Sequence, residues 1–124
     1  MLVTHWIPFW DADPNTGFAV YDSTLYNGQK GWYQVGGTSF GAPCWAALIG
    51  LADEGRTSPL TSLNTITSLY LTAGSTNSTG YSNNYFDVIS GSNGGVSSQT
   101  GYDLVTGIGS PKADVLVSTL NKSN

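Results

Sequence analysis

The sequence predicts a single domain of the α/β class, and three of its features lead to this prediction. Segments rich in strand-favouring residues alternate with segments whose apolar residues recur at helical spacing. Sixteen glycines mark turns and close backbone approaches. No internal repeat and no change of composition divides the 124 residues, a length that suits one small domain. Alternating strands and helices indicate a layered arrangement of helices against a sheet.

The first third of the chain contains the two best strand candidates. Residues 1–10 are apolar and aromatic without a clear period, so no element is assigned to them. A turn is predicted over 11–17, where proline, asparagine and glycine gather. Short strands are predicted over 18–21 and 32–35, with a turn over 26–31 between them.

A long helix is predicted after the second strand, ending at about Glu54. Pro43 falls in its first turn, where the missing N–H is harmless, and Gly55 suits the position just beyond its end. Four apolar residues recur at i, i+3, i+4 and i+7 and define its buried face: Trp45, Leu48, Ile49 and Ala52.

The second half of the chain is predicted to contain less regular structure. A shorter helix is predicted over 60–71, followed by a polar loop over 74–84. A buried strand is predicted over 85–89, and a loop of glycine, serine and asparagine over 90–102.

A last helix is predicted to begin at Pro111, with Ser110 as its N-cap. Three apolar residues are expected on its inward face: Val115, Leu116 and Leu120.

The composition argues against two classes of partner. Only four residues are basic, and they are scattered, so no patch exists that could neutralise nucleic-acid phosphates. No stretch approaches the roughly 20 apolar residues that a membrane span needs. Charged residues make up 10% of the chain, and such a surface of serine, threonine and asparagine suits an acidic extracellular medium.

The most informative motif runs from Val35 to Pro43 and reads V-G-G-T-S-F-G-A-P. It places Ser39 where a strand passes through glycines into a helix. Unpaired N–H groups at a helix start can stabilise negative charge that develops on a carbonyl oxygen during acyl transfer, and the glycines let a substrate backbone approach. The alternative is that Ser39 or Thr38 only caps the helix.

This motif resembles the G-T-S-x-x-x-P signature of the sedolisins, the serine-carboxyl peptidases, and more loosely that of the subtilisins. The sequence W-A-A-L-I over 45–49 is also sedolisin-like. The resemblance implies the C-terminal portion of a subtilisin-like three-layer fold with a parallel sheet. It also implies peptide hydrolysis at acidic pH through an acyl-enzyme on Ser39.

The family's other catalytic groups are not found in this sequence. Sedolisins use a Glu and an Asp from an upstream helix as the base, and a further Asp at the oxyanion. Glu54 is the sole Glu and is predicted to lie on the surface, and His5, the sole His, belongs to no recognisable motif. Cys44 has no His partner and is predicted to be a small buried hydrophobe. The chain alone is therefore predicted to be inactive.

A second constellation consists of two aspartates that bracket a glycine-rich loop. Calcium takes six to eight oxygen ligands, and glycines let backbone carbonyls turn toward an ion. The arrangement resembles the C-terminal calcium loop of sedolisins, although the family often has glycine where this chain has Gln99. The resemblance implies the carboxylates of Asp87 and Asp103 and the carbonyls of Val88, Gln99 and Gly101 as ligands. The alternative is an ordinary surface loop with two capping aspartates.

Taken together, residues 1–124 are interpreted as one partial peptidase domain. The nucleophile region covers 32–55 and the calcium-binding region covers 85–111. The resemblance implies a secreted protein with a peptide or protein substrate, and with the N-terminal remainder of the catalytic domain and a prodomain as partners. Two alternatives stay open: a non-catalytic, calcium-stabilised extracellular module, and a subtilisin-type fragment, against which the loop with Asp87 and Asp103 argues.

Overall fold

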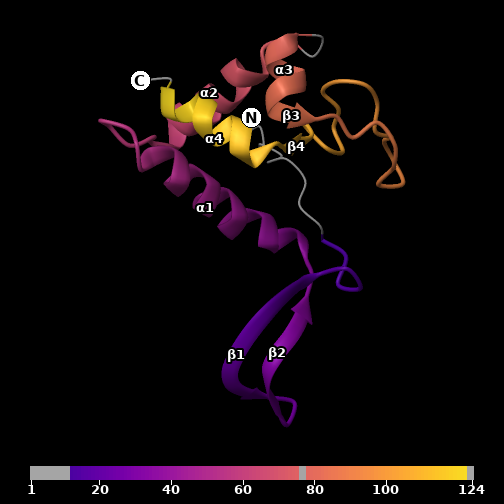
Figure 1. The fold of residues 1–124 in the computed structure, drawn as a ribbon. Helices are drawn as coiled ribbons and strands as arrows, with labels where there is room; N and C mark the ends of the chain where they lie inside the picture. The colour runs from indigo at the N-terminus through magenta and orange to yellow at the C-terminus, as the bar shows by residue number, and fades with distance from the viewer. Residues whose placement is uncertain (1–11, 76–77, 123–124) are drawn as a thin grey trace.

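A computed structural model describes residues 12–75 and 78–122 of the chain (Figure 1). These residues form a mixed α/β structure in which a β-hairpin projects away from a cluster of helices. In chain order the elements are β1 (Phe18–Tyr26), β2 (Gln29–Val35), the short 3₁₀ helix η1 (Thr38–Phe40), α1 (Gly41–Asp53), α2 (Ser62–Ala73), α3 (Thr79–Asn84), β3 (Tyr85–Phe86), β4 (Ser110–Pro111) and α4 (Ala113–Lys122).

The hairpin confirms both predicted strands and extends each of them. Its turn consists of Asn27 and Gly28, both with positive φ, as a type I′ turn between twisted strands requires. Pairing is regular from Phe18 opposite Val35 as far as Asp22, then shifts before the pair that flanks the turn. The predicted turn over 26–31 is therefore too long, because Asn-Gly needs only two residues to reverse the chain.

Both sheets in the described part of the chain are antiparallel and two-stranded. The parallel sheet implied by the family resemblance is not formed by these residues. Strand β2 pairs with its neighbour β1 because a two-residue turn can only return the chain antiparallel, whereas parallel pairing needs a long crossover. The second sheet pairs β3 with β4 over two residues each.

The core lies between the helices and β3. Along α1 the predicted period is confirmed, since Trp45, Leu48 and Ala52 are buried and Ile49 packs partly buried against them. The remaining buried apolar residues come from later elements: Leu69, Ala73, Tyr81, Tyr85, Ile108, Leu116 and Leu120. None of the helices in the described ranges is long and apolar enough to cross a membrane.

The last helix begins at Ala113, two residues later than predicted. Ser110 and Pro111 form β4 instead, because they pair with β3 across the core. Leu116 and Leu120 are fully buried as predicted, but Val115 is 38% exposed. The inward-facing prediction for Val115 was wrong because it lies one residue, about 100° around the helix, from the buried stripe.

Helix α3 falls inside the segment 74–84 that was predicted to be a loop. Its six residues have no apolar period, so the sequence contains no helical signal there. The helix is held by its N-cap, Ser78, whose hydroxyl accepts a hydrogen bond from the N–H of Tyr81 at 3.1 Å and donates to the carbonyl of Ala73 at 3.1 Å. The burial of Tyr81 in the core also anchors α3 to the rest of the structure.

Replacing Ser78 with alanine is expected to lower the free energy of unfolding by about 1 kcal/mol, because the cap and its link to α2 are lost. Ser82→Ala is the matched control, since that hydroxyl is exposed and bonds only within α3; we expect a loss under about 0.5 kcal/mol. Denaturant unfolding measures both, and equal losses would contradict the capping role.

Candidate functional site

Ser39 lies in η1, the single turn that joins β2 to α1, and its side chain is exposed. Gly37 precedes the turn with φ of 147°, a conformation that residues with side chains rarely adopt. The bonds of this turn run from the N–H of Phe40 to the carbonyl of Gly37 and from the N–H of Gly41 to the carbonyl of Thr38. Neither uses the N–H of Ser39, so that donor stays outside the turn's hydrogen bonds.

Two contacts hold the Ser39 turn against the base of the hairpin. The rings of Phe18 and Phe40 stack with centroids 4.0 Å apart. Gly36 lies against the turn at Asp13 and Pro14, where an added Cβ would come within 2.4 Å of the backbone N of Pro14. The close approach at Gly36 is therefore made by the chain's own backbone and not by a substrate, while Gly37 stays open.

The capping interpretation of Ser39 and Thr38 is not supported. The N-cap positions of η1 and α1 are Gly37 and Phe40, and neither helix start has a side-chain cap hydrogen bond. Within the ranges that the structure describes, the Ser39 hydroxyl makes no hydrogen bond. It is thus an exposed hydroxyl without a structural role.

Glu54, the sole Glu of the chain, is too far away to act as the base for this hydroxyl. Glu54 is exposed, as predicted, and lies at the far end of the 13-residue α1, about 20 Å from its start. His5 lies outside the described residues. Cys44 is half-buried on α1, beside the buried Trp45.

Two of the loop residues implied as calcium ligands bond through their N–H groups to the two aspartates. One oxygen of Asp87 (Oδ2) accepts a hydrogen bond from the N–H of Gly101 at 2.8 Å, although fourteen residues separate them. Asp103 Oδ2 accepts one from the N–H of Gln99 at 3.1 Å. Val88 follows Asp87 directly and is half-buried. The two aspartates therefore hold one stretch of loop between them.

Asp103 is 2% exposed and is the most completely bonded carboxylate of this region. Its Oδ1 accepts the N–H groups of Val105 at 2.8 Å and Thr106 at 2.7 Å. Its Oδ2 accepts the Thr106 hydroxyl at 3.0 Å in addition to the N–H of Gln99. These four donors occupy the roughly four acceptor positions of a carboxylate.

The environment of Asp103 favours its charged form. Removal from water raises the pKa of Asp103, but the hydrogen bonds from Thr106, Gln99 and Val105 together lower it more, so the pKa lies below its ordinary value. Asp103 therefore organises its own loop as a charged acceptor, as in the alternative of capping aspartates, although it is buried and not on the surface. Sequence reasoning missed Thr106, whose hydroxyl supplies one of the four bonds.

Tyr81 is a second residue of this region that the sequence did not indicate. Its hydroxyl donates to Asp87 Oδ1 at 3.0 Å, and its ring stacks on that of Tyr85. Burial, this hydrogen bond and the negative charges of Asp87 and Asp103 all raise the pKa of Tyr81 well above its ordinary value. Both carboxylates thus act on the same phenol.

The residues present fit a calcium ion in part. Asp87 accepts one donor on each oxygen, which leaves acceptor positions for a cation. The hydroxyl of Ser98, next to Gln99, is buried and has no hydrogen-bond partner. Asp103, in contrast, would have to release or share a donor. Because no three His, Cys, Asp or Glu residues cluster in the described part of the chain, backbone carbonyls and water would supply the other ligands.

Comparisons with protein-family models, with curated proteins and with solved structures found no match for this chain. The functional argument therefore depends on the residues and the geometry described above.

Proposed function

We propose that the chain is the C-terminal part of the catalytic domain of a secreted serine-carboxyl peptidase of the sedolisin type, with Ser39 as its nucleophile. The observation that carries the proposal is the exposed, unbonded hydroxyl of Ser39 in the turn that joins β2 to α1. A hydroxyl with no structural task, held at a helix start behind two glycines, suits a group that must reach a substrate carbonyl.

In the proposed reaction, Ser39 Oγ attacks the carbonyl carbon of a peptide bond and loses its proton to a carboxylate base. The tetrahedral intermediate collapses, the amine leaves with a proton, and the acyl group stays on Oγ until water releases it. This chain contributes the nucleophile Oγ. The N–H of Ser39 and the positive end of α1 would stabilise the negative charge that develops on the carbonyl oxygen. The base comes from outside the described residues, and a carboxylate base favours acidic pH.

The hairpin provides support for a docking role toward the N-terminal remainder of the catalytic domain. Among the residues that the structure describes, strand β2 has a hydrogen-bonded neighbour on one edge only, so its other edge can accept a further strand. On one face, Tyr21 and Trp32 pair across the strands and are 61% and 74% exposed. A parallel sheet completed on this edge, with helices packed against its faces, would cover those rings and give the subtilisin-like layers.

Calcium is proposed to bind at Asp87, with the carbonyl oxygens of Val88, Gln99 and Gly101 and with Asp103 as the further candidates. When bound, the ion would neutralise part of the charge of the two carboxylates and tie together a loop that contributes little to the core. A role in stability and not in the chemical step follows, because the loop does not include Ser39.

Adding calcium is therefore expected to raise the melting temperature of the chain. At an ion concentration a hundred times the dissociation constant, the free energy of unfolding should increase by roughly 2–3 kcal/mol. Asp87→Asn should remove this shift, since Asp87 has acceptor positions left for a cation. Asp114→Asn on the exposed start of α4 is the control and should keep it. An identical melting temperature with calcium and with chelator would contradict the site.

A second candidate function is a non-catalytic, calcium-stabilised extracellular module. The observation that favours it is that no described residue makes a hydrogen bond to the Ser39 hydroxyl, while the loop around Asp103 is organised without any contribution from Ser39. A subtilisin-type fragment is less well supported, because the loop with Asp87 and Asp103 was not expected for it.

Sequencing the coding DNA upstream of Met1 tests the proposed function against this second candidate. An in-frame helix with Glu and Asp four residues apart, followed by a later Asp for the oxyanion, would support a serine-carboxyl peptidase. A start codon with no coding sequence before it would contradict the proposal and leave the calcium-stabilised module.

A further inference from the structure

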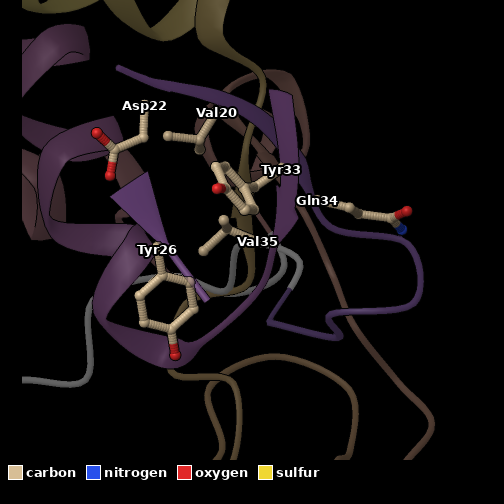
Figure 2. A pocket seen from close by; sticks show the side chains of 6 residues that line it. All are labelled: Val20, Asp22, Tyr26, Tyr33, Gln34 and Val35. Atoms are coloured by element: carbon tan, nitrogen blue, oxygen red, sulfur yellow. The ribbon is translucent and has the colours of Figure 1, made fainter. Parts of the chain in front are cut away.

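One face of the hairpin carries a hollow of about 280 Å³ (Figure 2). Its lining residues are Val20, Asp22, Tyr26, Tyr33, Gln34 and Val35. Val20 and Tyr33 are directly paired, and alternate residues along each strand share a face, which places Asp22 and Val35 on the same side. The side chain of Gln34 points away from the others and donates to the carbonyl of Asn15.

The hollow results from an irregularity in the strand pairing. Between the pair Asp22–Gly31 and the pair Tyr26–Gln29, three residues of β1 face only Lys30 of β2. Such a bulge bends the strand and increases its twist. The bend brings Tyr26 from the end of β1 toward Tyr33, so that their rings meet edge to face with centroids 6.4 Å apart.

The groups around the hollow are fixed in position. The hydroxyl of Tyr33 donates to the carbonyl of Gln29 on the same strand, which fixes the orientation of the ring. Asp22 Oδ1 accepts the N–H of Thr24 at 2.8 Å, which orients the carboxylate. Its Oδ2 makes no hydrogen bond, and Asp22 makes no ion pair, with any residue in the described ranges. Lys30 alternates with Gly31 and so belongs to the other face of β2.

We propose that this hollow binds the cationic side chain of a lysine or arginine in a peptide. Two aromatic rings at right angles and a carboxylate with a free oxygen match an ammonium or guanidinium group, which stacks on aromatic faces and pairs with carboxylates. A single carboxylate among apolar walls offers too few oxygen ligands for a metal ion, and an apolar guest would make no use of the free carboxylate oxygen.

The position of the hollow connects it with Ser39. Val35, at its edge, is four residues before Ser39, so the Cα atoms of these two residues are at most about 14 Å apart. Asp22 lies farther away, since it pairs with Gly31, eight residues before Ser39. If the proposed function holds, the bound side chain belongs to a substrate, and this step rests on that proposal. Binding of the cationic side chain itself does not depend on the proposed function, because it needs no catalytic group.

The test is an NMR titration of the aromatic signals of Tyr26 and Tyr33 with N-acetyl-arginine amide and N-acetyl-lysine amide. The neutral analogues N-acetyl-citrulline amide and N-acetyl-norleucine amide are the matched ligand controls. We expect saturable shifts of both tyrosines, with affinity for the neutral analogues at least about 5-fold weaker. Equal affinity for arginine and citrulline, or shifts that avoid the hairpin, would overturn the proposal.

Two variants locate the interaction in the hollow. Asp22→Asn keeps an acceptor for the N–H of Thr24 and should weaken binding about 10-fold. Tyr26→Leu keeps an apolar wall and should weaken it about 3-fold to 10-fold. Glu54→Gln removes one charge at the far end of α1 and should change nothing. Unchanged binding in Asp22→Asn would overturn the proposal. Binding should persist in Ser39→Ala, so the cation-binding proposal can hold even if Ser39 is not a nucleophile.

Discussion

Replacing Asp103 with alanine is expected to lower the free energy of unfolding by about 3 kcal/mol. The variant removes the acceptor of four hydrogen bonds at once. The N–H groups of Val105 and Thr106 would then be left in a buried loop without partners, and the loop that ends at Gly109 would lose its internal order.

Denaturant unfolding followed by circular dichroism measures this loss, with Asp114→Ala as the matched control. Asp114 is also an aspartate, but it is exposed in the first turn of α4, so its removal should cost under about 0.5 kcal/mol. Losses of similar size in the two variants would show that the bonds to Asp103 do not hold the loop.

The pH dependence of the stability difference between the wild type and Asp103→Ala provides a second check. Since the pKa of Asp103 is lower in the folded chain than its unfolded value near 3.9, its contribution is fully present above that value. The contribution is lost as the pH falls through the folded pKa. The stability difference between the wild type and Asp103→Ala should therefore be constant above about pH 5 and shrink below about pH 4.

If the proposed function holds, Ser39→Ala is expected to lower kcat for peptide hydrolysis by the complete peptidase domain by about 10⁴-fold or more, because no acyl-enzyme can form. The fold should not change, since the Ser39 hydroxyl is exposed and makes no hydrogen bond within the described ranges. We therefore expect an unchanged melting temperature together with the lost activity.

Ser118→Ala is the control for this activity measurement. Its hydroxyl is exposed on α4 and bonds only to the carbonyl of Asp114 one turn earlier, so activity should stay within about 2-fold of the wild type. Full activity in Ser39→Ala would exclude Ser39 as the nucleophile. The isolated chain is expected to show no hydrolysis, whether it is the wild type, Ser39→Ala or Ser118→Ala.

The elements with strong local signals were predicted correctly from the sequence. Helix α1 is indicated by the spacing of Trp45, Leu48 and Ala52, which the core then buries. The hairpin strands follow from their aromatic and β-branched residues. Helix α3 could not be predicted, because its stability comes from the Ser78 cap and from tertiary burial of Tyr81 and not from propensity.

The boundaries of the C-terminal elements depend on long-range contacts, which a single sequence does not display. Pro111 is a good first residue for a helix, but pairing of β4 with β3 keeps it extended and delays α4 to Ala113. The glycine at 109 has φ of 82° and lies against the carbonyl of Phe86, where an added Cβ would approach to 2.2 Å. This contact fixes the strand that precedes the helix.

The sequence indicated which residues belong to the candidate sites, but not which hydrogen bonds those residues make. The structure places the N–H of Gly101 on Asp87 and the N–H of Gln99 on Asp103, whereas the family resemblance implied the carbonyl oxygens of Gln99 and Gly101 as ligands. It also shows that the protein itself occupies the acceptor positions of Asp103, which no pattern of residue types reveals. Whether a carboxylate holds an ion or its own loop depends on where nearby N–H groups point, and that is fixed only by the folded backbone.

The central claim, that Ser39 is a nucleophile, is tested most directly by trapping the acyl-enzyme. The proposed peptidase domain that includes this chain would be mixed with a peptide p-nitrophenyl ester at about pH 4, quenched with acid, digested and mapped by mass spectrometry. We predict the added acyl mass on the peptide that contains Ser39, and no addition in Ser39→Ala. Hydrolysis that proceeds without acylation of Ser39, or with equal acylation in the variant, would contradict the claim.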